Sequence, residues 1–146
     1  MNSDQQQFNQ LKLEPHQLAE FYIDAFAQLQ VRHFEKLVER QTRDQLKLVV
    51  DIGGGCGYFA RELYKRTGLG VRVVDSDLAA VSTCTDFACD YVEAIVGDAL
   101  CPDVRGDEDI VCFNMILHHL VGASEYETRD LQMQALRAWL SEAKYV

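Results

Sequence analysis

The residues best suited to chemistry form a glycine-rich loop, which follows an apolar run that ends at Asp51. The loop contains Gly53, Gly54 and Gly55, and a further glycine, Gly57, precedes a helical pattern. Glycine adopts backbone conformations that a Cβ atom forbids, so main-chain N–H groups and the next helix N-terminus can approach a ligand closely. The pattern therefore predicts a small-molecule binding loop. Asp51 either contacts the ligand, directly or through water, or tethers neighbouring loop N–H groups.

A second acidic residue, Asp75, ends the next apolar run along the chain. Ligands of open α/β folds bind beyond the carboxyl ends of the strands, where an acidic residue can accept hydrogen bonds from ribose hydroxyls. Asp75 is therefore a candidate nucleoside contact, with a solvated turn acid as the structural alternative. Ser76 and Asp77 follow it and fit either adenine contacts or the N-cap of the next helix.

The elements that must position these residues alternate between short apolar runs and helical patterns. This alternation is typical of a parallel sheet with helices on its faces, so we predict an α/β fold. Strands are expected at residues 46–51, 71–74, 91–96 and 109–115, and helices at about 58–66, 78–88 and from 124 onward. Ser124 and Glu127 have the spacing of a capping box at the start of the last helix.

The N-terminal third of the chain has a different pattern. From Pro15 to about Gln41 apolar residues recur at intervals of three and four, which predicts one amphipathic helix or two with a break near Gln30. We expect a disordered or frayed end at residues 1–14, a helical lid segment at 15–45 and a ligand-binding core at 46–146, all within one domain.

Size and charge restrict the partners of the chain. Its 146 residues are enough for one domain with a real core. A net charge of −9 argues against a nucleic-acid partner, because such surfaces use Lys and Arg to neutralise phosphates. No apolar run approaches the roughly 20 residues that span a bilayer, and the N-terminus does not resemble a signal peptide. We therefore expect a cytoplasmic protein without nucleic-acid or membrane partners.

The five cysteines show no Cys-x-x-Cys pair and no zinc-ligand spacing. This predicts reduced thiols and no metal site. Cys56 lies in the glycine loop near a helix N-terminus, which favours a thiolate, but we favour the simpler interpretation that it is a small residue filling a tight turn.

The sequence from Asp51 to Gly57, Asp-x-Gly-x-Gly-x-Gly, resembles motif I of the class I S-adenosylmethionine-dependent methyltransferases. The resemblance covers about residues 17–146 and implies a three-layer Rossmann-like sheet with an N-terminal helical extension. It implies S-adenosylmethionine as cofactor, S-adenosylhomocysteine as product and a small molecule as methyl acceptor. The cofactor-binding residues that it implies are Asp51, Gly53, Gly54, Gly55, Asp75, Ser76, Asp98, Ala99 and Asn114.

These positions follow the family's pattern strand by strand. Asp98 and Ala99, after the third strand, would meet the adenine, although Gly-Asp is also a common turn pair. Asn114 would lie beside the methionine part through its main chain. The amphipathic segment with Phe21, Tyr22, Phe26 and Phe34 would cover the site and shape the acceptor cavity.

His118 and His119 are weak catalytic candidates. An imidazole titrates near neutrality and could take the acceptor's proton, but these two could equally line the acceptor cavity. The family often needs no base, because alignment of the acceptor with an activated sulfonium supplies most of the acceleration. The segment 114–120 lacks the Pro-Pro-aromatic motif of enzymes acting on exocyclic or amide nitrogens and resembles the small-molecule branch. The acceptor atom stays open.

Length is the main departure from the family. The family's sheet has strand order 3-2-1-4-5-7-6, whereas this chain reaches Val146 just where a fifth strand should begin. We therefore expect a sheet truncated after strand 4 or at the start of strand 5. An apolar edge strand tends to pair with another chain, which predicts a homo-oligomer, a completing chain or a longer enzyme.

Two other functions compete with the methyltransferase hypothesis. One is a non-catalytic module that keeps the methyltransferase-like fold for interaction with a partner. The other is a nicotinamide oxidoreductase, but a Gly-x-Gly-x-x-Gly pattern starting at Gly53 or Gly54 would need glycine where Tyr58 or Phe59 stands.

Overall fold

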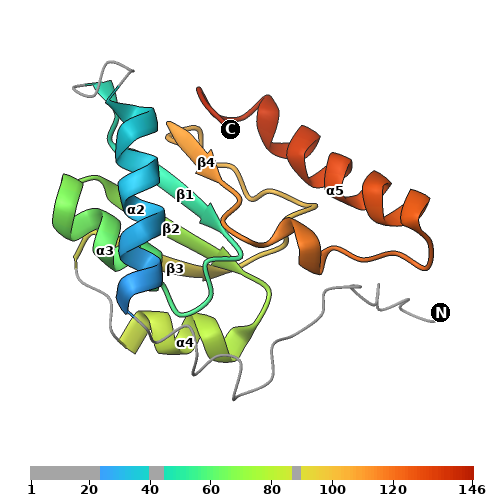
Figure 1. Ribbon diagram of the computed structural model, residues 1–146, viewed down its shortest axis with the longest axis horizontal. Coiled ribbons are helices and arrows are strands. Elements are labelled where there is room, and N and C mark those ends of the chain that lie inside the picture. Colours follow the sequence, from blue (N-terminus) through green and yellow to red (C-terminus); the bar gives the residue numbers. More distant parts are fainter. Residues whose placement is uncertain (1–23, 40–44, 87–89) are drawn as a thin grey trace.

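The computed structural model describes residues 24–39, 45–86 and 90–146 of the chain (Figure 1). This part forms a four-stranded sheet of β1 (Leu48–Ile52), β2 (Gly70–Asp75), β3 (Val92–Val96) and β4 (Ile110–Cys112). All neighbouring strands are parallel, and the order β3-β2-β1-β4 is the one expected for the first four strands. The helices are α2 (Asp24–Val38), α3 (Tyr58–Thr67), α4 (Leu78–Asp86), the 3-10 turn η2 (Leu117–His119) and α5 (Glu125–Leu140).

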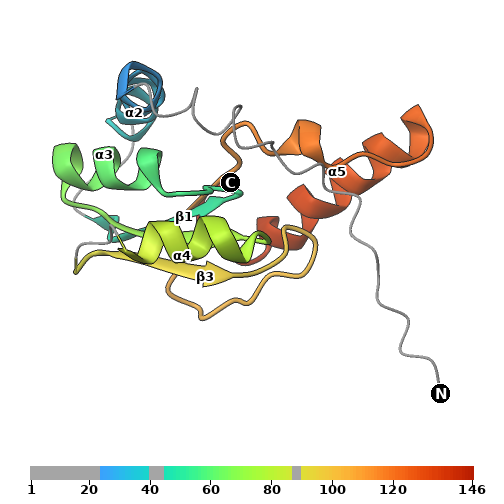
Figure 2. The same cartoon turned by 90° about the horizontal axis from the view of Figure 1, so that it is seen from below.

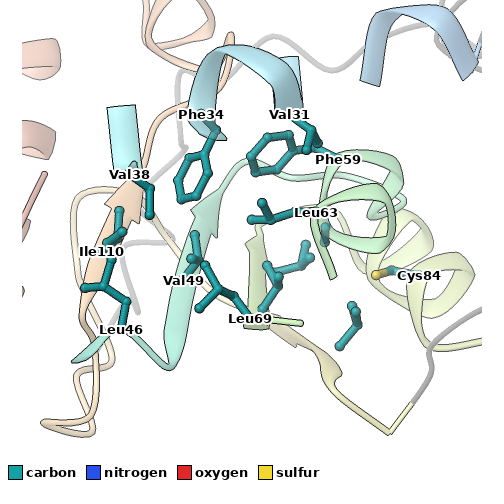
Figure 3. Packing of buried hydrophobic residues seen from close by; sticks show 14 residues of the cluster. Val31, Phe34, Val38, Leu46, Val49, Phe59, Leu63, Leu69, Cys84 and Ile110 are labelled. Carbon is teal, nitrogen blue, oxygen red and sulfur yellow. The ribbon is translucent and has the colours of Figure 1, made fainter. Parts of the chain in front are cut away.

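Helices α2, α3 and α4 cover one face of the sheet. Successive strand residues point to opposite faces, so Val49 of β1 and Val71 of β2 share this side. They pack with Leu63 of α3, Val31 of α2 and Cys84 of α4 in one buried cluster (Figure 3). Figure 2 shows α2 outside α3, on the side of α3 away from the sheet. Three helices thus cover this face of the sheet.

Helix α5 covers the opposite face. Val50 of β1 and Val74 of β2, whose side chains point to this second face, pack there with Val111 of β4 and with Ala135 and Trp139 of α5. Helices on both faces of a parallel sheet make three layers, which confirms the predicted α/β fold.

Helix α2 runs without a break past Gln30. Phe34 is 8% exposed and packs edge-on against Phe59, with ring centroids 6.0 Å apart (Figure 3). It therefore belongs to the core beside α3, where it covers part of the apolar surface of that helix. Pro15, residues 1–14 and the side chains of Phe21, Tyr22 and Phe26 lie outside the described part of the chain.

Strand β4 is shorter than the predicted 109–115. It ends at Cys112, and Met115 turns the chain with φ of 53°, a left-handed conformation that costs a non-glycine residue energy. On the outer edge of β4, Tyr145 forms a parallel bridge with Ile110. The Val111 N–H donates to the Tyr145 carbonyl at 2.9 Å, so Tyr145 occupies the place where a fifth strand would begin.

The capping box of α5 is present in an altered form. The Ser124 hydroxyl accepts from the Glu127 N–H at 3.2 Å, as predicted. The Glu127 carboxylate accepts from the Ala123 N–H at 2.8 Å, so the reciprocal bond reaches one residue further back.

No helix in residues 24–39, 45–86 and 90–146 combines the length and apolar character that a membrane span requires. Among the same residues, no group of three His, Cys, Asp or Glu side chains could hold a metal ion.

Candidate functional site

The glycine loop connects β1 to α3 at the carboxyl edge of the sheet. Gly53, Gly55 and Gly57 have φ angles of 69°, 54° and 75°, which residues with a Cβ rarely adopt. The Gly53 N–H donates to the Val74 carbonyl at 2.7 Å, which fixes the loop to the end of β2. Gly57 is the N-cap of α3, so that helix begins directly at the loop.

Two loop glycines differ in what surrounds them. A Cβ atom added to Gly53 would lie 2.4 Å from Cγ1 of Ile116, which lies in the segment after β4. A Cβ added to Gly55 would have no atom within 4 Å. The loop is therefore closely packed at its first glycine and open at Gly55, where a ligand could approach the backbone.

Asp51 lies beneath the loop and is fully buried. Its Oδ1 accepts a hydrogen bond from Nδ2 of Asn114 at 3.0 Å, and its buried Oδ2 has no hydrogen-bond partner. A Cβ on Gly54 would lie 2.4 Å from that Oδ2. Burial is the main cause that raises the pKa of Asp51 to about 7; the Asn114 hydrogen bond opposes the rise and the nearby Asp75 charge contributes to it. Asp51 is thus an unsatisfied acceptor directly under the glycine loop.

The raised pKa of Asp51 predicts a pH dependence of stability. The folded state holds a proton that the unfolded chain releases above pH 3.8, so stability is lost as pH rises toward about 7. We expect Asp51→Asn to remove this loss, which is on the order of 2–4 kcal/mol. Urea unfolding of both proteins at pH 4 and pH 8 measures the difference. Parallel pH profiles for the two proteins would contradict the assignment, and Asp103→Asn, at an exposed site, is the control.

Asp75 ends β2 and faces the loop. Its Oδ2 accepts the Gly55 N–H at 2.9 Å and its Oδ1 accepts the Asp77 N–H at 2.8 Å. Burial raises the pKa of Asp75, and the bonds from Asp77 and Gly55 oppose that rise. Each carboxylate oxygen has a further lone pair, so the group can also accept from a ligand hydroxyl. The structure thus brings the second predicted acid into direct contact with the loop.

Asp77 is the capping residue of α4. Its Oδ1 accepts the Ala79 N–H at 3.1 Å, and its carbonyl accepts the Val81 N–H at 3.0 Å. Of the two roles considered for Asp77, adenine contact or helix N-cap, the structure shows the N-cap. Ser76 lies between the two acids and is half-buried.

Asp98 and Ala99 follow β3 at the same edge of the sheet. The Asp98 Oδ1 accepts the Leu100 N–H at 3.0 Å, and its buried Oδ2 has no hydrogen-bond partner. Ala99 is 7% exposed, and its carbonyl accepts Nε1–H of Trp139 at 3.0 Å. Asp98 thus retains an unsatisfied acceptor, whereas Ala99 is held in the core by α5.

His118 and His119 lie in η2, after β4. Their ring centroids are 4.0 Å apart with the planes tilted by 40°. His119 interacts electrostatically with Asp75 and lowers its pKa. The pair therefore lies on the same side of the sheet edge as the glycine loop and its acids.

The sequence indicated Asn114 as a site residue but did not show that it bonds Asp51. Asp51 is the second-last residue of β1 and Asn114 lies two residues after the adjacent β4, where Asp51 pairs with Cys112. That adjacency follows from the strand order, but the bond depends on side-chain conformations that no spacing reveals.

Arg72 is a further residue that sequence reasoning missed. It is 4% exposed and donates to Glu108 at 2.8 Å, to Glu93 at 3.1 Å and to Asp107 at 3.1 Å. It therefore ties the segment after Asp98 to β2 and β3. An arginine inside the apolar run of β2 was the available signal, because a buried charge requires partners.

Two kinds of relatives match the chain. Trans-aconitate 2-methyltransferase of Mycobacterium tuberculosis (strain ATCC 25177 / H37Ra) is 29% identical over 118 residues, which are 80% of this chain and 44% of the relative. The same enzyme of Mycobacterium bovis (strain BCG / Tokyo 172 / ATCC 35737 / TMC 1019) matches equally. The chain thus spans less than half the length of these curated relatives. No family model matches it.

Solved structures share the architecture at low identity. The plantazolicin methyltransferase BpumL, in complex with a pentazolic desmethylPZN analog and SAH, superposes with a TM-score of 0.70 at 14% identity, over 89% of this chain and 50% of BpumL. SAM-bound CalS10, an amino pentose methyltransferase from Micromonospora echinaspora, gives 0.65 at 14% identity, over 91% and 53%. The apo methyltransferase SibL gives 0.61 at 22%, over 89% and 37%. The chain therefore has the fold of the class I S-adenosylmethionine-dependent methyltransferases, and its relatives in sequence and structure are methyltransferases.

Proposed function

We propose that this chain binds S-adenosylmethionine and forms the cofactor-binding portion of a methyltransferase that acts on a small molecule. The observation that carries the proposal is the 2.9 Å contact between the Gly55 N–H and the Asp75 carboxylate. It supports the proposal, because an acid that could bind ribose lies against an open stretch of glycine backbone, at the edge where α/β folds bind ligands.

The unsatisfied acceptors of the site support this cofactor. Buried polar atoms without partners are rare in native proteins, and a ligand that supplies donors accounts for them. The two here are Oδ2 of Asp51, under the loop, and Oδ2 of Asp98, after β3. The cofactor's ammonium group suits the first and the adenine amino group suits the second. Its positive charge also suits a site where two buried acids, Asp51 and Asp75, have raised pKa values.

The cofactor would supply a methyl group on an activated sulfonium, so the chain's residues need only bind, orient and exclude water. Gly53, Gly54 and Gly55 would hold the methionine end, Asp75 the ribose, and Ser76, Asp98 and Ala99 the adenine. Asn114 would lie beside the methionine part through its main chain and orient Asp51. His118 and His119 stay candidates for proton acceptance or for lining the acceptor cavity.

Three further predictions from the sequence are also part of this proposal. They are a cytoplasmic location, a small-molecule acceptor and a partner strand along the outer edge of β4. The chain's own Tyr145 bridges Ile110 at this edge, so a partner strand would continue from that bridge or replace it. Trans-aconitate, the acceptor named in the relatives, is the first compound to test.

Isothermal titration with S-adenosylhomocysteine tests the proposal. We expect one binding site in the wild-type chain and a roughly 5- to 150-fold weaker affinity in Asp75→Asn, the effect of losing charge-assisted hydrogen bonds worth about 1–3 kcal/mol. Asp103→Asn, at an exposed residue after β3, should bind like the wild type. Equal affinities for all three proteins would remove Asp75 from the site.

NADH is the competing ligand in the same titration. Gly55, Gly57 and Ala60 have the spacing of the relaxed dinucleotide pattern, in which alanine replaces the third glycine. The sequence alone therefore does not exclude a nicotinamide cofactor. We expect no heat of binding with NADH, and binding of NADH without S-adenosylhomocysteine would replace the proposal by the oxidoreductase alternative.

A further inference from the structure

We propose that peroxide can link Cys56 and Cys84 in a reversible disulfide, which ties the glycine loop to α4. Cys56 is partly exposed in the loop, whereas Cys84 is fully buried on α4. The effect on ligand binding rests on the proposed function, but the formation of the disulfide does not.

Close packing brings the two cysteines together. A Cβ added to Gly57, the neighbour of Cys56, would lie 2.4 Å from Sγ of Cys84, so this thiol fills the space that the glycine leaves. The Cys84 sulfur therefore lies within about 4 Å of the Gly57 Cα, which is about 3.8 Å from the Cys56 Cα. The side chain of Thr83, the residue before Cys84, lowers the pKa of the Cys56 thiol, which is consistent with Cys56 lying close to this part of α4. The two thiols also interact electrostatically.

The loop can supply the small movement that a disulfide requires. Cys56 stands between Gly55 and Gly57, whose positive φ angles mark backbone without side-chain restraint. The same Gly55 donates to Asp75, so a bond at the next residue would pull on the contact between loop and acid. Oxidation should therefore reach the candidate ligand site directly.

The chemistry balances with a peroxide as oxidant. Hydrogen peroxide converts the Cys56 thiol to a sulfenic acid and releases one water. The Cys84 sulfur then attacks the Cys56 sulfur, forms the S–S bond and releases a second water. A dithiol reductant such as dithiothreitol reverses the product to two thiols.

The rate of this reaction depends on pH. Burial raises the pKa of the Cys56 thiol and raises that of Cys84 to about 11, and the thiolate is the reactive form. We therefore expect slow oxidation near neutrality and faster oxidation at pH 9.

Peptide mapping by mass spectrometry after peroxide treatment of the folded chain tests the pair. The expected result is a linked peptide containing Cys56 and Cys84, with the loss of two hydrogen atoms, that disappears with dithiothreitol. Cys56→Ser and Cys84→Ala should lack the linked peptide. Cys101→Ser, at an exposed cysteine, should retain it. Unlinked Cys56 and Cys84, or a linkage of either to a different cysteine, would overturn the proposal.

Titration with S-adenosylhomocysteine tests the consequence. We expect at least tenfold weaker affinity in the oxidised wild type, recovery on reduction, and no change on peroxide treatment of Cys56→Ser. If the disulfide forms and the affinity for S-adenosylhomocysteine does not change, the proposed effect of oxidation on the ligand site is wrong. Failure of the reduced wild type to bind would contradict the proposed function, while the peptide map would still decide whether the disulfide forms.

Discussion

Gly53→Ala is expected to lower the free energy of unfolding by about 2–5 kcal/mol and to abolish detectable binding of S-adenosylhomocysteine. The left-handed conformation costs a residue with a Cβ about 1–2 kcal/mol, and overpacking adds about 1–3 kcal/mol. Both apply here, because φ is 69° and the new Cβ would lie 2.4 Å from the Ile116 side chain. Urea unfolding and calorimetric titration measure the two effects.

Gly55→Ala is the matched control for stability. Its φ of 54° is equally left-handed, but no atom lies within 4 Å of the added Cβ. Only the conformational cost of about 1–2 kcal/mol should therefore appear. Equal losses in the two variants would show that the contact between Gly53 and Ile116 does not hold the loop in place.

Trp139→Ala should have the largest effect on stability, about 3–5 kcal/mol, the usual cost of removing a buried aromatic side chain. Trp139 is 1% exposed at the centre of the cluster between α5 and the sheet. Its Nε1–H also holds the Ala99 carbonyl, so the segment after β3 should loosen with it. Thermal and urea unfolding, followed by circular dichroism, provide the measurement.

Two substitutions separate the parts of this effect. Trp139→Phe keeps most of the ring but loses the bond to Ala99, and should cost about 1 kcal/mol plus a small packing loss. Tyr126→Ala changes an aromatic residue of the same helix that is 81% exposed, and should stay within about 0.5 kcal/mol of the wild type. A loss at Tyr126 comparable with that at Trp139 would contradict the assignment of the core.

The sheet and the glycine loop could be predicted because each has a local sequence sign. The alternating apolar and helical patterns fixed the order of the elements, and the spacing of Gly53, Gly55 and Gly57 fixed the turn. Asp75 was predictable in the same way, since it ends a run that pairs with β1.

The side-chain network of the site was not predictable. The bond between Asp51 and Asn114 joins residues 63 positions apart and depends on their rotamers. Strand β4 ends at Cys112, earlier than predicted. The chain then turns at Met115, whose left-handed conformation could not be predicted because the residue is not a glycine. Phe34 was assigned to a lid by its apolar character, but the same character serves the core against α3. In each case tertiary packing decided among conformations that the local pattern left open.

A crystal structure of the chain grown with S-adenosylhomocysteine tests the central claim most directly. We expect the ligand along the loop at Gly55, with its ribose hydroxyls on the Asp75 carboxylate and its donors on the Oδ2 atoms of Asp51 and Asp98. A loop without ligand at saturating concentration, or a ligand bound elsewhere, would contradict this.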